Sequence, residues 1–69
     1  MKYYELSYFF GRSDSGSVFV KTILDLDSYD EDEFINMLVD RGELDSYYAD
    51  AIVQIDDIDE KTYRDVIGA

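Results

Sequence analysis

The chain has 69 residues, of which 17 are acidic and six are basic, so its formal net charge at pH 7 is −11. It contains no histidine, cysteine or proline, which excludes Ser-His-Asp and Cys-His catalysis, ordinary zinc sites and disulfide frameworks. The excess of acids also argues against direct binding to nucleic acid, because affinity for phosphates depends on Lys and Arg side chains.

The composition predicts one folded acidic domain over residues 1–69. Apolar residues make up 46% of the chain and aromatic residues 16%, whereas disordered acidic segments are poor in both. The first residues lack the apolar stretch of a signal peptide, and no stretch has the length needed to span a bilayer. We therefore expect a cytoplasmic protein (in the host cell if it is phage-encoded), either a monomer or a weak homodimer, without cofactor or membrane association.

The first third of the chain is typical of a β-hairpin. Residues 2–10 alternate in the two-residue period of a strand, with Phe10 expected in the core. The glycines and serines of residues 11–17 predict the hairpin loop. β-Branched residues then alternate from Val18 to Leu26 and predict a second strand.

A helix is predicted from residue 28 to residue 41. Ser28 and Glu31 match a capping box, in which the two side chains cap the first turn of a helix. Gly42 supplies the stop at the other end. At 100° per residue, the stripe expected to be buried consists of Phe34, Ile35, Met37 and Leu38. Opposite this stripe lie Asp32, Glu33, Asn36 and Asp40.

The segment 46–58 is compatible with a strand and with a helix. We expect the strand, because its Ile-Val-Gln-Ile cluster is β-rich and two strands alone make a marginal sheet. Asp59 is then expected to cap a terminal helix that buries Tyr63, Val66 and Ile67. The predicted fold is α+β in the order ββαβα, a three-stranded antiparallel sheet of order 2-1-3 with the helices packed on one face. That face is expected to carry Tyr4, Leu6, Tyr8, Val18, Val20, Leu24, Val53 and Ile55.

The negative charge is concentrated in one stretch of the chain. Residues 25–60 hold 14 acids and one base, whereas the segments before and after are each slightly positive. Acids in the first turn of a helix stabilise it, but the four consecutive acids from Asp30 to Glu33 repel one another, and no lysine four residues on relieves them. The number of acids exceeds what helix capping needs, and this excess predicts a surface for a basic partner. Tyr47, from the tandem pair Tyr47 and Tyr48, is expected to serve as a hydrophobic anchor. The candidate partner-binding residues are Asp25, Asp27, Asp30, Glu31, Asp32, Glu33, Asp40, Glu43, Asp45, Tyr47, Asp56, Asp57, Asp59 and Glu60.

In size, charge and predicted element order the chain resembles the small acidic phage-encoded inhibitors, the anti-CRISPR and anti-restriction proteins, with type I anti-CRISPRs as the nearest group. The resemblance covers the whole chain, but it consists of size, charge and predicted fold, and no sequence motif is shared. Several members of this group are DNA mimics. The resemblance implies a non-enzymatic inhibitor whose DNA-like acidic surface blocks a basic, nucleic-acid-binding site, for example in a CRISPR surveillance complex, without binding nucleic acid itself.

Two other interpretations remain open. Tyr3, Phe9 and Phe19 share the other face of the predicted sheet and could form the contact surface of a structural or regulatory interaction module, with acidity serving solubility. An acidic surface is also typical of an ordinary domain from a halophile, which unfolds at low salt.

The sequence contains two incomplete motifs for ligand binding, a P-loop and an EF-hand loop. Residues 11–16 have the glycine spacing of a P-loop but lack the Lys-Ser/Thr that follows it. An EF-hand loop starting at Asp25 would need glycine and glutamate where the chain has Asp30 and Asn36. A domain of this size offers little room for the deep pocket that would raise the pKa of one carboxyl in an acid-base pair. We therefore expect no enzyme and no metal site.

Overall fold

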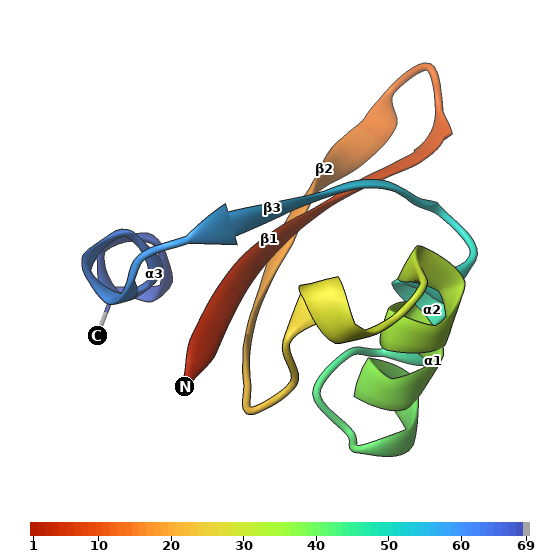
Figure 1. Cartoon of the computed structure of the whole chain (residues 1–69). Helices are drawn as coiled ribbons and strands as arrows, with labels where there is room; N and C mark the ends of the chain where they lie inside the picture. Colours follow the sequence, from red (N-terminus) through yellow and green to blue (C-terminus); the bar gives the residue numbers. More distant parts are fainter. Residues whose placement is uncertain (69) are drawn as a thin grey trace.

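The computed structural model describes residues 1–68, which form one sheet and a set of short helices (Figure 1). In chain order the elements are β1 (Lys2–Gly11), β2 (Asp14–Thr22), the 3-10 helix η1 (Leu26–Ser28), α1 (Glu31–Asp40), α2 (Ser46–Ala49), β3 (Ile52–Ile58) and α3 (Glu60–Ile67). The strand order is β2-β1-β3, with both pairs antiparallel. The predicted α+β class and the predicted strand order are confirmed.

The core lies between one face of the sheet and the layer formed by η1, α1 and α2. The rings of Tyr4 and Phe34 meet edge to face at its centre, with centroids 5.1 Å apart. The Tyr4 hydroxyl is hydrogen-bonded despite its burial, because the Leu26 backbone N–H donates to it at 3.0 Å. The buried apolar side chains of this core are Tyr4, Leu6, Val20, Leu24, Phe34, Ile35, Leu38 and Leu44.

The β1–β2 hairpin is tighter than the sequence predicted. Gly11 pairs with Asp14, so only Arg12 and Ser13 form the turn. The loop predicted over residues 11–17 is therefore wrong for most of its length, which belongs to β2.

A glycine is tolerated inside β2 because an aromatic ring of the neighbouring strand covers it. Tyr8 lies opposite Gly16 in the register. A Cβ atom at Gly16 would lie 2.8 Å from the Tyr8 hydroxyl oxygen, so any other residue there would force the Tyr8 ring to move. The glycine is thus a strand position with a packing role.

The second strand ends at Thr22, four residues before the predicted end at Leu26. The Thr22 side chain accepts a hydrogen bond from the Leu24 backbone N–H at 3.1 Å, which turns the chain away from the sheet edge. Leu24 is still buried in the core, as expected, but it reaches the core from the loop.

The start of α1 differs from the prediction. Its N-cap residue is Asp30, whose side chain makes no capping hydrogen bond, and Ser28 belongs to η1. The prediction that Ser28 and Glu31 form a capping box is therefore wrong. Ser28 is part of η1, and Asp25 caps this preceding turn, because its carboxylate accepts from the Asp27 N–H at 3.2 Å. The end of α1 is as predicted, with Gly42 at a φ of 76° after it.

The ambiguous segment 46–58 contains both structures. Its first residues form the single helical turn α2, and β3 follows from Ile52. The register between β1 and β3 shifts between Ser7 and Tyr8, which leaves Val53 65% exposed and packs Ile52 against the core. The prediction that Val53 lines the core is wrong, because a bulge reverses the alternation of side chains at that point.

The terminal helix α3 buries no residue. Val66 and Ile67 are about half exposed, contrary to the prediction. The helix touches the sheet through Tyr63, whose ring lies 4.9 Å from that of Tyr3, and Tyr3 belongs to the set of β1 side chains that points away from the core. Figure 1 accordingly places α3 at the end of β3, apart from α1 and α2.

Candidate binding surface

The layer that covers the core face of the sheet carries most of the charge. Residues 25–50, which include η1, α1 and α2, contain ten acids and one base, Arg41, whereas residues 1–24, which include the hairpin, contain two acids and three bases. We call the exposed carboxylates of this segment the acidic layer. Its members are Asp25, Asp27, Asp30, Glu31, Asp32, Glu33, Asp40, Asp45 and Asp50.

The outer face of α1 forms the middle of the acidic layer. Phe34, Ile35 and Leu38 are buried on the core side of this helix, so the helical period turns Asp32 and Asp40 outward. Both are exposed, as the sequence predicted. Asp32 and Asp40 lie two turns apart on this face with Asn36 between them, and no lysine of residues 1–68 neutralises either of them.

Two members of the acidic layer also cap helical turns. The carboxylate of Asp25 accepts from the Asp27 N–H at 3.2 Å, and that of Asp45 accepts from the Tyr47 N–H at 3.0 Å. Satisfying a free N–H at the start of a turn is a common structural role of aspartate. Capping accounts for these two positions and leaves the acids of α1 without such a role.

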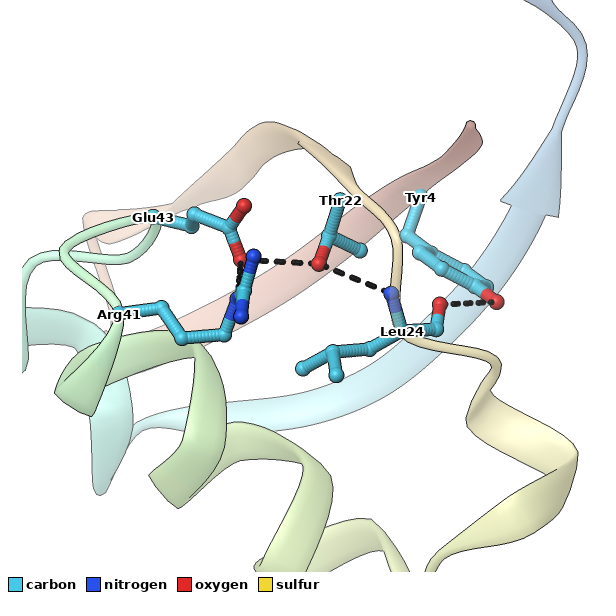
Figure 2. A network of polar contacts seen from close by, with 5 residues as sticks. All are labelled: Tyr4, Thr22, Leu24, Arg41 and Glu43. Carbon is cyan, nitrogen blue, oxygen red and sulfur yellow. Dashed lines mark hydrogen bonds and ion pairs between the residues drawn. The ribbon is translucent and has the colours of Figure 1, made fainter.

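Glu43, also a predicted partner-binding residue, is held by two contacts within the protein (Figure 2). It accepts from the Thr22 hydroxyl at 2.8 Å and from the Arg41 guanidinium at 2.9 Å. Its side chain is only 22% exposed. The structure therefore gives Glu43 a part in joining the loop after α1 to the end of β2.

The last group of predicted acids lies apart from the acidic layer, around the end of β3. Asp56 pairs with Glu5 in the register, whereas Asp57 pairs with Tyr4, so the two acids point to opposite faces of the sheet. Asp56 accepts two hydrogen bonds from the Gln54 side chain, at 3.0 and 2.8 Å.

The two acids at the start of α3 are engaged by the helix itself. The Thr62 backbone N–H donates to Asp59 at 2.7 Å, and hydrogen bonding to Thr62 holds the pKa of Asp59 below its usual value. Glu60 forms an ion pair with Arg64 at 2.9 Å and accepts from the Tyr3 hydroxyl at 3.2 Å. Nearby cations therefore compensate part of the charge in this group.

Tyr47 is the predicted aromatic anchor, and the structure surrounds it with other rings. It is 63% exposed, and its ring lies 4.9 Å from that of Phe10 and 5.2 Å from that of Tyr48. Phe10 is 40% exposed, so the prediction that it lies in the core is wrong. Its position as the last aromatic residue before the hairpin turn is the one signal that could have placed it at the rim of the sheet.

Asp50 was also absent from the predicted set, although it lies in the acid-rich stretch and is exposed. It follows α2 as the C-cap residue. The count of acids over residues 25–60 includes Asp50 and could have indicated it as a candidate.

The open face of the sheet is polar at its centre. The Ser17 hydroxyl donates to Glu5 at 2.8 Å, and Ser7 lies between Ser17 and Gln54 in the register. The aromatic residues that the sequence places on this face are separated by these polar side chains, and Tyr3 packs against Tyr63. Phe9 is exposed and Phe19 is half-buried.

Within residues 1–68 no pocket forms, and no three acidic side chains are grouped so that they could hold a metal ion. In this part of the chain no helix has the length and apolar character needed to cross a membrane. Comparison with protein-family models, curated proteins and solved structures gave no match.

Proposed function

We propose that the protein is a non-enzymatic inhibitor that places its acidic layer in a basic, nucleic-acid-binding site of another protein. The observation that carries the proposal is the segregation of charge between two layers of one small domain. The layer over the sheet holds ten acids and one base, while the hairpin is close to neutral. Solubility alone needs a net charge of only about 2–8 for a small domain.

The density of charge supports a nucleic-acid site as the target. Ten acids and one base leave nine net negative charges in residues 25–50. The acidic layer cannot extend further than the 32 Å longest dimension of the molecule, so its nine net charges are spaced no more than about 3.6 Å apart on average along that direction. One strand of duplex DNA carries one charge per about 3.4 Å of helix axis. A basic groove that neutralises phosphates would therefore meet a comparable number of charges on this surface.

Part of the charge on α1 is unfavourable to the fold, which favours a role in binding: four acids follow one another at its start, and Asp40 lies in the last turn, where the helix dipole disfavours a negative charge. Asp32, Glu33 and Asp40 make no hydrogen bond or ion pair with another side chain within the described residues 1–68. The consecutive acids from Asp30 to Glu33 repel one another, and the chain has no lysine or arginine four residues on from any of them. A basic partner would relieve this repulsion, so association should be fast, electrostatically steered and sensitive to salt.

The test is a binding measurement with basic nucleic-acid-binding proteins at two salt concentrations, followed by competition with duplex DNA. The resemblance to anti-CRISPR proteins makes a type I surveillance complex the first partner to examine. We expect binding to weaken at least about tenfold when NaCl rises from about 0.1 to about 0.5 M. Duplex DNA should displace the protein from its partner.

Charge reversal locates the surface. The test variant carries Asp32→Lys and Asp40→Lys, both on the outer face of α1. Asp32 lies in the first turn and Asp40 in the last, so the changes in interaction with the helix dipole offset each other. The control carries Asp14→Lys and Asp65→Lys, which change the net charge equally at exposed positions outside the acidic layer.

We expect the α1 variant to lose most of its affinity and the control to keep most of it. Equal losses in the two variants would mean that only total charge matters. Unchanged affinity in the α1 variant would overturn the proposal, and unfolding of the unmodified protein at low salt would favour the halophile interpretation instead.

A further inference from the structure

Four aromatic rings gather where the hairpin meets α2, and we call them the aromatic cluster: Tyr8, Phe10, Tyr47 and Tyr48. The Tyr8 ring lies 5.4 Å from Phe10 and 4.8 Å from Tyr48, and the Phe10 ring lies 4.9 Å from Tyr47. Each ring therefore contacts at least two others. The cluster joins two segments that are far apart in the sequence.

The surrounding backbone holds the aromatic cluster in place. The Phe9 N–H donates to the Ala51 carbonyl at 3.0 Å, which ties the end of β1 to the end of the α2 turn. On the other side, the Tyr8 ring rests over Gly16. Tyr8 and Tyr48 are half-buried, whereas Tyr47 is 63% exposed. A rigid base thus presents the rings of Tyr47 and Phe10 to solvent, at a low entropic cost of binding.

Two carboxylates of the acidic layer flank the same helical turn. Asp45 precedes α2 and accepts from the Tyr47 N–H at 3.0 Å, and Asp50 is the C-cap residue of the turn. Both are exposed. The surface around the two exposed rings therefore combines aromatic faces with negative charge.

This combination matches one type of side chain better than any other. A guanidinium group is planar, stacks on aromatic rings, and forms forked hydrogen bonds with carboxylates, whereas an ammonium group is a compact, strongly hydrated charge. We propose that the aromatic cluster, with Asp45 and Asp50, binds an arginine side chain of a basic partner. This inference rests on the proposed function, because the partner of the acidic layer supplies the arginine.

The experiment compares an oligo-arginine peptide with an oligo-lysine peptide of equal length and charge. Affinities are measured by isothermal titration calorimetry, and the contact is located from the NMR shifts of the aromatic rings. We expect the arginine peptide to bind about two- to five-fold more tightly for each guanidinium that stacks on a ring. The largest ring shifts should occur at Tyr47 and Phe10.

Three variants separate the contribution of the ring from that of the charge. Tyr47→Leu keeps an apolar side chain but removes the aromatic face, so it should abolish the preference for arginine while leaving the affinity for the lysine peptide unchanged. Tyr47→Phe should retain the preference. The matched control is Phe9→Leu, an exposed aromatic position on the opposite set of β1 side chains, which should also retain it. Thermal unfolding establishes that each variant is folded.

The outcomes separate this inference from the proposed function. Equal, salt-sensitive binding of the two peptides would overturn the arginine site and leave the acidic layer as the binding surface. No binding of either peptide would overturn both. Shifts at Tyr47 and Phe10 that depend on protein concentration alone would assign the cluster to contact with a second copy of the chain, and would overturn the arginine site.

Discussion

The Thr22 hydroxyl donates to the Glu43 carboxylate at 2.8 Å and accepts from the Leu24 backbone N–H at 3.1 Å (Figure 2). Thr22 is fully buried, so both of these bonds replace contacts with water. Glu43 is held from the other side by Arg41. This chain of contacts fixes the end of β2 to the loop after α1, and so attaches the acidic layer to the sheet.

Replacing Thr22 with valine preserves the shape of the side chain and removes both hydrogen bonds. The Leu24 N–H and the Glu43 carboxylate lose a partner, so we expect Thr22→Val to lower the free energy of unfolding by about 1–3 kcal/mol. Urea denaturation measures the change. The control is Ser28→Ala, which removes an exposed hydroxyl that does not cap α1 and should change stability by less than about 0.5 kcal/mol. A loss for Ser28→Ala as large as that for Thr22→Val would contradict this assignment.

Gly42 ends α1 in the left-handed conformation, with a φ of 76°. A side chain in that region strains the backbone, so Gly42→Ala should destabilise the protein by about 1–2 kcal/mol. Gly11→Ala is the matched control, because Gly11 has no positive φ and a Cβ atom there would meet no other atom within 4 Å. Thermal unfolding of the two variants tests the difference. An equal effect of the two substitutions would show that lost chain flexibility, and not strain, determines the result.

Periodicity was sufficient to predict the three strands and the two longer helices, α1 and α3, in their order along the chain, but not the short η1 and α2. A buried face repeats every second residue in a strand and about every third or fourth in a helix. Periodicity failed where a single residue changed the pattern. The bulge in β3 moves Val53 out of the core, and no local signal marks the bulge because it depends on the pairing of Ser7 and Tyr8. The capping box predicted at Ser28 failed because two contacts shape the chain between β2 and α1. The carboxylate of Asp25 caps the Asp27 N–H locally, and the Leu26 N–H donates to the distant Tyr4 hydroxyl, a contact that the local sequence does not indicate.

The sequence was sufficient to predict that the candidate surface is acidic, but not which side chains from distant segments meet there. The count of acids along the chain located the acidic layer, because residues 25–50 are contiguous and cover one face of the sheet. The contact between Phe10 and Tyr47 joins residues from β1 and α2, and only the tertiary structure brings them together. Asp56 and Asp57, by contrast, are placed on opposite faces of β3 by the two-residue period of a strand.

Glu5 and Asp56 lie directly opposite each other on β1 and β3, and like charges in such a pair destabilise a sheet. We expect Asp56→Asn to raise the free energy of unfolding by about 0.2–1 kcal/mol, because an amide oxygen still accepts from Gln54 and the repulsion is gone. The control is Asp57→Asn, which changes the net charge equally on the other face of the strand. The difference between the two variants, measured by urea denaturation, gives the effect of the pair. A larger gain for Asp57→Asn would contradict it.

The contact between Tyr3 and Glu60 predicts a change at high pH. Partial burial of Tyr3, followed by its hydrogen bond to Glu60 and the charge of that carboxylate, raises the pKa of the Tyr3 phenol above 10.0. Because the folded-state pKa is above the unfolded-state value, the contribution of this group to stability is complete below about pH 10 and is lost as the pH rises through the folded-state pKa. Ionised Tyr3 would repel Glu60 and loosen the attachment of α3.

NMR titration of selectively labelled tyrosine rings measures this pKa directly, and urea denaturation across the same pH range measures the loss of stability. Glu60→Gln should lower the pKa of Tyr3, since it removes the charge and leaves an amide as acceptor. Tyr3→Phe should remove the part of the pH dependence that comes from this contact, whereas Tyr29→Phe, at another half-buried tyrosine, should retain it. If the Tyr3 titration does not respond to Glu60→Gln, the hydrogen bond does not hold α3 against β1, and the packing of Tyr63 on Tyr3 must do so alone.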